Sequence, residues 1–183
     1  MAPAPALTTD EYFRTPESVL PTELMFGAMR VAESPTVWHQ QAVAAFHLAL
    51  APHVRARRLG HVFLAPLDVV FDAARHLVMQ PDLLFVKSGR EHILERKVNG
   101  IPDMVLEVLS PNPRIGTLDE RVQLFAQYGV REIWLLHQSA ERFEILSVKD
   151  GRVADRQRFD YGAPLTSGVL PTFTSTVGEI LRG

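Results

Sequence analysis

The feature that most constrains this chain is the stretch IPDMVLEVLS at residues 101–110, because it contains a nearly continuous apolar run. The run covers Met104 to Leu109 and is interrupted once, by Glu107. Its length and its Val and Leu content, bounded by glycine and proline, predict a strand covered on both faces and hence an α/β fold. A carboxylate inside such a strand is costly to desolvate unless a cation or hydrogen-bond donors meet it.

A second apolar strand, QPDLLFV at residues 80–86, also follows a Pro-Asp pair and begins after Asp82. Side chains alternate along a strand, so Asp103 and Glu107 should project to one face. If the two strands are neighbours, Asp82 and Glu107 can approach each other, and paired carboxylates suit Mg²⁺. The alternative is structural: Asp82 and Asp103 are strand-entry acids, and Glu107 pairs with an arginine.

Length and composition favour one ordinary globular domain over residues 1–183. The net charge of −2 argues against polybasic nucleic-acid binding but leaves a local basic groove open. The absence of cysteine excludes disulfides and thiolate metal sites and is compatible with a reducing cytoplasm. No apolar stretch is long enough to cross a bilayer, and the first residues lack a secretion signal. We therefore expect a cytoplasmic protein without membrane contact.

The pattern along the chain predicts alternating strands and helices. A strand–helix–strand unit over residues 104–137 implies a right-handed parallel crossover. The other expected elements are a short helix with a capping box from Thr8, a hairpin over 22–31, a long helix from Ser34 that ends or kinks at Pro52, strands near 61–64, 67–71 and 77–79, a helix over 117–128, a hairpin over 143–159 and a short C-terminal helix.

The ordered strings QPDLLFV, GIPDMVLEVLSP, FAQYGV and REIWLL, preceded by TELMFG and VWHQQAV, resemble the Uma-two family, whose members are classed as restriction endonucleases. The resemblance covers nearly the whole chain. It implies an α/β fold of the PD-(D/E)XK nuclease type, with a mixed central sheet flanked by helices and an N-terminal β-hairpin.

The resemblance also implies a Mg²⁺-dependent, or Mn²⁺-dependent, DNA endonuclease. Asp82 and Glu107 take the positions of its metal-binding catalytic acids, and the carbonyl of Val108 is a further metal ligand. Hard carboxylate oxygens suit this ion, which lowers the pKa of its bound water. DNA is then the partner, and a homodimer remains open. Two alternatives are a catalytically impaired nucleic-acid-binding module that keeps the fold, and a structural or toxin-like partner protein.

The sequence departs from the family pattern at the lysine. Leu109 stands where the superfamily motif has lysine, two positions after Glu107. Family members often carry the lysine on the next helix, four residues after an aspartate, and these positions match Arg121 and Thr117. Arginine can hold a phosphate but does not lose a proton at working pH. Arg121 is therefore the third candidate catalytic residue.

Two accessory candidates precede the central strands. Glu23 keeps an acid of the family's opening hairpin, whereas Phe26 and Ala28 replace its common Asp and Glu. His39 matches a family histidine that could orient Glu23 or touch the active site, and a capping or packing role is equally compatible.

The remaining polar candidates have weaker support. We expect Asp68 to face solvent, and both tryptophans, Trp38 and Trp134, to serve packing. Basic residues could contact DNA phosphates, although a solvated surface explains them more simply: Arg55, Arg57, Arg58, Lys87 and Lys97.

Overall fold

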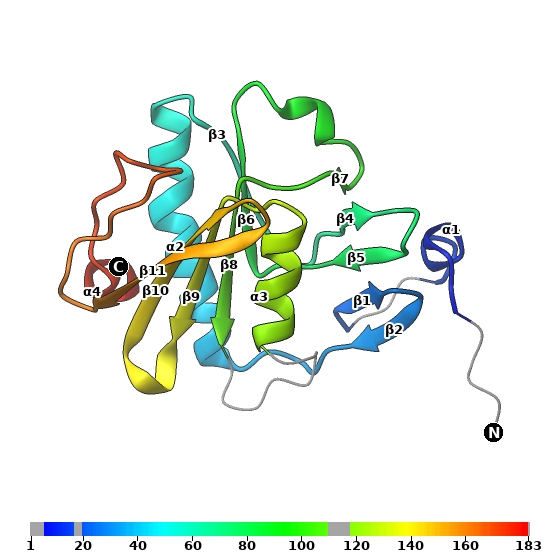
Figure 1. Ribbon diagram of the computed structural model, residues 1–183. Coiled ribbons are helices and arrows are strands. Elements are labelled where there is room, and N and C mark those ends of the chain that lie inside the picture. Colours follow the sequence, from blue (N-terminus) through cyan, green and yellow to red (C-terminus); the bar gives the residue numbers. More distant parts are fainter. Residues whose placement is uncertain (1–5, 17–19, 110–117, 183) are drawn as a thin grey trace.

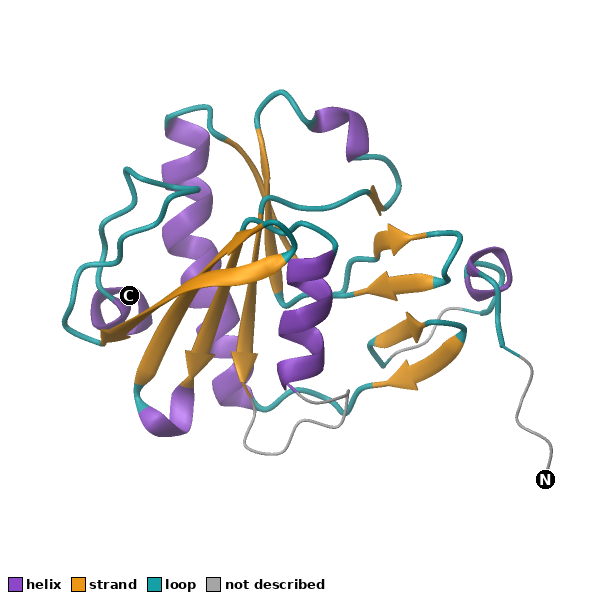
Figure 2. Ribbon diagram, in the orientation of Figure 1, coloured by secondary structure: helices purple, strands orange, loops and turns teal. Residues whose placement is uncertain are grey.

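The computed structural model describes residues 6–16, 20–109 and 118–182. A six-stranded sheet forms the centre of the molecule (Figures 1 and 2), in the order β11-β10-β9-β8-β6-β3. Its strands are β3 (Gly60–Leu64), β6 (Leu83–Lys87), β8 (Met104–Leu109), β9 (Glu132–His137), β10 (Arg142–Lys149) and β11 (Arg152–Asp160). β8 and β9 are parallel, and the other neighbouring pairs are antiparallel.

A second, five-stranded sheet has the order β2-β1-β5-β4-β7 and includes the N-terminal hairpin. Its strands are β1 (Thr22–Met25), β2 (Ala28–Val31), β4 (Val69–Asp72), β5 (Leu77–Met79) and β7 (Val98–Asn99). The expected hairpin and mixed central sheet are confirmed. The strands between residues 22 and 79 nevertheless divide between two sheets, which the linear pattern does not reveal.

The helices pack against both sheets, and three of them cover the two faces of the large sheet. They are α1 (Thr9–Tyr12), α2 (Val37–Ala56), α3 (Leu118–Gln127) and α4 (Val177–Arg182), with 3-10 turns η1 (Glu91–Ile93) and η2 (Gln138–Ala140). α3 connects the parallel strands β8 and β9, which confirms the predicted crossover unit. No helix in the described part of the chain is long and apolar enough to span a membrane.

Alternate side chains of the central strands enter two separate cores. Leu83, Phe85 and Leu106 pack with α2 and α4, whereas Leu84 and Val105 pack with α3 and with residues of the five-stranded sheet. Because both faces are covered, the middle strands can be apolar throughout, as the sequence predicted. The α3 face is the one on which Glu107 projects.

Two expectations about residues of α2 need correction. α2 begins after the N-cap Thr36 and continues past Pro52 to Ala56, so the proline does not end it. Trp38 lies in the first turn of α2 and is 69% exposed, so it is not a packing residue. Trp134 is buried as expected, and its indole N–H donates to Glu132.

Asp68 was expected to face solvent, and this is wrong. One of its carboxylate oxygens accepts hydrogen bonds from the Tyr12 hydroxyl at 3.0 Å and the Gln80 side-chain amide at 2.9 Å. Burial, and then the charge of Asp68, raises the pKa of the Tyr12 hydroxyl. The tyrosine therefore stays a neutral donor, and Asp68 helps to fix α1 against the five-stranded sheet.

Candidate functional site

Glu107 lies in β8, and Asp82 immediately precedes the neighbouring strand β6. β6 and β8 pair antiparallel, with Leu83 opposite Leu106. Continuing this register by one residue places Asp82 opposite Glu107, and directly opposed residues project to the same face. The structure therefore brings these two predicted residues together, at one end of the strand pair and on the side that α3 covers.

Arg121 of α3 links Glu107 to the five-stranded sheet. Its Nη2 lies 2.7 Å from Glu107 Oε1, and its Nη1 lies 2.7 Å from Glu23 Oε2. The Arg121 side chain is only 11% exposed. Burial lowers the pKa of this guanidinium, but the two carboxylates outweigh burial and raise it. This ion pair is the contact that the structural alternative expected for Glu107.

The ion pair with Arg121 does not fully offset the cost of burying the Glu107 carboxylate. Burial raises the pKa of its carboxyl to about 7, and the charges of Asp82 and Glu23 act in the same direction against Arg121. Glu107 and Glu23 share the Arg121 guanidinium, and Asp82 pairs with His39, so three carboxylates lie near two basic side chains.

Asp82 is held on its other side by α2 and by β8. Its Oδ2 accepts from the Val108 N–H at 2.8 Å and lies 3.1 Å from His39 Nε2. Burial opposes protonation of His39, but the hydrogen bond to Asp82 and the nearby charges raise its pKa overall. Of the roles considered for His39, contact with the site is realised, through Asp82 rather than Glu23. Its backbone N–H also donates to the N-cap Thr36.

Glu23 has a second partner that the sequence did not reveal. Its Oε1 accepts from the backbone N–H of Gln80 at 2.7 Å. Gln80 stands two residues before Asp82, so the segment that enters β6 fixes both acids. The position of Gln80 in the QPD string is the only sequence signal that could have indicated its contact with Glu23.

Comparison with models of protein families identifies the family of this chain. A model of the Uma2 family, described as "Putative restriction endonuclease", matches residues 9–178. The chain belongs to the Uma2 family. A search of curated proteins finds no match.

A solved structure confirms the fold expected of this Uma2 member. It is described as "a putative nuclease belonging to DUF820 from Anabaena variabilis". The two chains superpose with a TM-score of 0.80 at 17% sequence identity, covering 96% of this chain and 98% of the other. At this identity the comparison supports the nuclease-like fold and no residue role.

The donor set of this Uma2 protein fits a hard divalent cation. Asp82 Oδ1 and Glu107 Oε2 have no hydrogen-bond partner among the described residues, and the surroundings carry an excess of negative charge. Within residues 6–16, 20–109 and 118–182, no three His, Asp or Glu side chains are grouped as a metal site. Mg²⁺ commonly binds through one or two carboxylates and keeps several waters, so two acids suffice.

Several other predicted candidates lie away from these acids. Asp103 occupies the opposite end of β8, where it accepts from the Lys87 N–H at 2.8 Å and pairs with Arg90 at 2.9 Å. It is a strand-entry acid, as one interpretation proposed. Lys97 lies 3.0 Å from the centre of the Phe13 ring, which is a cation–π contact. Thr117 lies outside the described residues.

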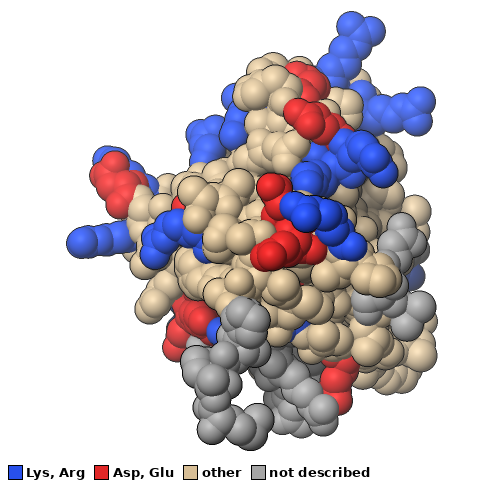
Figure 3. All heavy atoms as spheres, turned by 90° about the vertical axis from the view of Figure 1, so that its right-hand side faces the viewer, with Lys and Arg blue, Asp and Glu red and all other residues tan. Residues whose placement is uncertain are grey.

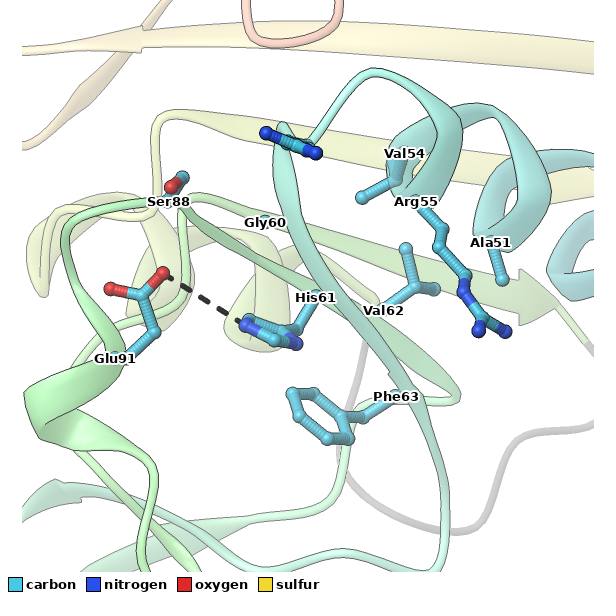
Figure 4. Close-up of a pocket in the computed structure, with 10 residues that line it drawn as sticks. Ala51, Val54, Arg55, Gly60, His61, Val62, Phe63, Ser88 and Glu91 are labelled. Atoms are coloured by element: carbon cyan, nitrogen blue, oxygen red, sulfur yellow. Dashed lines mark ion pairs between the residues drawn. The ribbon is translucent and has the colours of Figure 1, made fainter.

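A cavity of about 460 Å³ lies between the C-terminal end of α2 and β3 (Figure 4). Arg55 and Arg58 line it, together with His61, whose Nε2 is 3.9 Å from Glu91 Oε1. None of the predicted metal-site residues lines this cavity. The suggestion that these arginines contact DNA remains a prediction.

Proposed function

We propose that this Uma2 protein is a Mg²⁺- or Mn²⁺-dependent endonuclease that hydrolyses phosphodiester bonds in DNA. The observation that supports this most strongly is the placement of Asp82 opposite Glu107 on adjacent strands, beneath Arg121. Family membership supports the same reaction class. Glu107 lies within β8 and Asp82 immediately precedes β6, so regular strands support both acids and favour a fixed site.

Asp82 and Glu107 would hold the ion, with the Val108 carbonyl as a further candidate ligand. When bound, the ion would lower the pKa of a coordinated water and stabilise negative charge on the phosphate. The chain itself orients the acids: the Val108 N–H and His39 hold Asp82, and Arg121 holds Glu107. Neither Leu109 nor Arg121 can accept a proton from water at working pH.

Supercoiled plasmid tests this function. Wild-type protein should nick it with Mg²⁺ or Mn²⁺ and not with EDTA. Asp82→Asn should abolish nicking, because it removes an anionic ligand, whereas Asp150→Asn in the exposed β10–β11 turn should behave as wild type. Equal nicking by Asp82→Asn and wild type would rule out this site.

A catalytically impaired DNA-binding module is the second candidate. It is favoured by Leu109 and by the two ion pairs that occupy Arg121 Nη1 and Nη2. A metal-dependent gel shift without nicking would support it over the enzyme. Failure of purified protein both to bind and to nick DNA would instead favour the structural alternative.

A further inference from the structure

A second charged cluster lies on the outer part of the large sheet. Glu144 of β10 is 1% exposed and is surrounded by four side chains from β9, β10 and β11. They are His137, Arg142, Arg156 and Arg158.

The buried carboxylate holds Arg156 and Arg158 by hydrogen bonds and lies close to the guanidinium of Arg142. Glu144 Oε1 lies 3.1 Å from Arg158 Nε and 3.4 Å from Arg142 Nε, and Oε2 lies 2.8 Å from Arg156 Nη1. Arg158 donates through Nε and Arg156 through Nη1, and no other described residue accepts from either. Their remaining N–H groups are therefore available to another acceptor.

The cluster carries more positive charge than its own carboxylate can neutralise. Three guanidinium groups face one glutamate, and Arg158 is 66% exposed while Arg142 and Arg156 are each 41% exposed. Asp160, two residues beyond Arg158, forms no ion pair with these arginines in the described structure. One arginine would be enough to neutralise the charge of Glu144.

The strand register places this cluster on the same face as the candidate metal acids. Glu107 is opposite Leu135, Leu135 is opposite Glu144, and Glu144 is opposite Arg158. At about 4.8 Å between strands, Glu144 is about 10 Å and Arg158 about 14 Å across the sheet from Glu107. One DNA strand carries one phosphate per about 3.4 Å of helix axis, so a strand that crosses the sheet would place phosphates near both the acids and the arginines.

A second surface rich in charged side chains differs from the cluster around Glu144 in the mixture of its charges. On the face shown in Figure 3, basic side chains gather over the upper part and acidic side chains lie among them. That face does not form one continuous basic surface. The cluster around Glu144 instead combines exposed guanidinium groups with a buried carboxylate that fixes them, an arrangement suited to phosphate oxygens.

We propose that Arg142, Arg156 and Arg158 form a backbone phosphate subsite for DNA, a few nucleotides from the bond that is cut. The subsite rests on the proposed nuclease function for its substrate. Glu144 is a positioning residue within it, because it contacts the arginines rather than the phosphate. The subsite gives a chain of net charge −2 a local means of holding DNA.

Binding of a labelled DNA duplex, measured by fluorescence anisotropy in EDTA at several salt concentrations, tests the subsite without cleavage. Arg156→Gln/Arg158→Gln should weaken binding at least about tenfold and reduce the salt slope by one to two, since each lost phosphate contact lowers it by about 0.9. Arg152→Gln, at the start of β11, is the matched control and should change neither quantity. Arg158→Lys should retain the salt slope if the charge is what binds, and circular dichroism checks that each variant is folded.

The outcomes separate the two proposals. Equal affinity and salt slope for the double variant and wild type would overturn the subsite, even if wild type nicks plasmid. DNA binding that depends on these arginines, in a protein that never nicks, would support the subsite and contradict the nuclease. A folded Arg158→Lys protein that binds as weakly as the Arg156→Gln/Arg158→Gln protein would contradict a phosphate contact that depends on charge.

Discussion

Arg121 shows how a single side chain can both support and limit this site. It joins Glu107 on β8 to Glu23 on β1, so one guanidinium bridges the two sheets. Its two terminal nitrogens are occupied by carboxylates, and its charge only partly offsets the desolvation of Glu107. The residue therefore has a structural role even if it also acts toward DNA.

Replacing Arg121 should reveal that structural role. Arg121→Ala leaves Glu23 and Glu107 buried without their cation, so we expect a loss of about 3–5 kcal/mol in the free energy of unfolding. Arg121→Lys keeps the charge and should lose less, and it should keep or increase nicking because lysine can titrate. Urea unfolding and plasmid nicking measure these effects. A loss below about 1 kcal/mol for Arg121→Ala would show that the ion pairs contribute little.

Glu107→Gln should separate stability from activity. The substitution removes one anion from a cluster with excess negative charge, so metal-free protein should melt at an unchanged or higher temperature. Plasmid nicking should be lost. A marked fall in melting temperature without metal would instead identify Glu107 as a structural residue, held in place by Arg121.

Some of the site residues could be predicted from the sequence, but their contact partners could not. Asp82 and Glu107 could be found because each interrupts or precedes an apolar strand after Pro-Asp. The contact between Glu23 and Arg121 joins residues 98 positions apart, and one sequence contains no signal for it. The same limit applied to His39, for which the partner Asp82 was not foreseen.

At the scale of single elements, local patterns were most informative where burial was complete. β8, β9 and α3 were predicted within a residue or so, because long apolar runs and helical spacing define them. α2 was predicted to end or kink at Pro52 and continues beyond it to Ala56. Tertiary packing of a twenty-residue helix outweighs one missing hydrogen bond.

Gly60, at the start of β3, allows a close approach to the backbone of β6 that a larger residue would prevent. Its φ is +146°, and a Cβ there would collide with the Val86 carbonyl oxygen and lie 2.9 Å from Lys87 Cα. Gly60→Ala should lower the free energy of unfolding by about 1–3 kcal/mol. Gly162→Ala, where a Cβ meets nothing within 4 Å, is the control for urea unfolding. Equal stability of the two variants would contradict the close strand approach.

The β10–β11 hairpin should show a pH-dependent contribution from Glu144. Burial raises the pKa of its carboxyl, but Arg156, His137 and Arg142 outweigh burial and lower it below 4.5. A depressed folded-state pKa stabilises the protein above the unfolded pKa, and this contribution is lost as pH falls through the folded value. The difference in unfolding free energy between wild type and Glu144→Gln should therefore shrink from pH 7 to pH 3. A constant difference would contradict the ion pairs.

The whole molecule places the candidate site where its two sheets meet. β1 supplies Glu23, β8 supplies Glu107 and α3 supplies Arg121 between them. The order of elements was readable from the sequence, but sheet membership was not, because it depends on long-range pairs such as β1 with β5. Family resemblance supplied the nuclease-like architecture, which the structural comparison confirms.

Asp82 and Glu107 should form one divalent-cation site, and calorimetric titration of metal-free protein with Mn²⁺ tests whether they do. Wild type should bind one ion, and Asp82→Asn and Glu107→Gln should each lose that binding while remaining folded. Glu91→Gln, which removes an exposed carboxylate elsewhere, should bind as wild type does. Unchanged Mn²⁺ binding by folded Asp82→Asn and Glu107→Gln proteins would contradict the account.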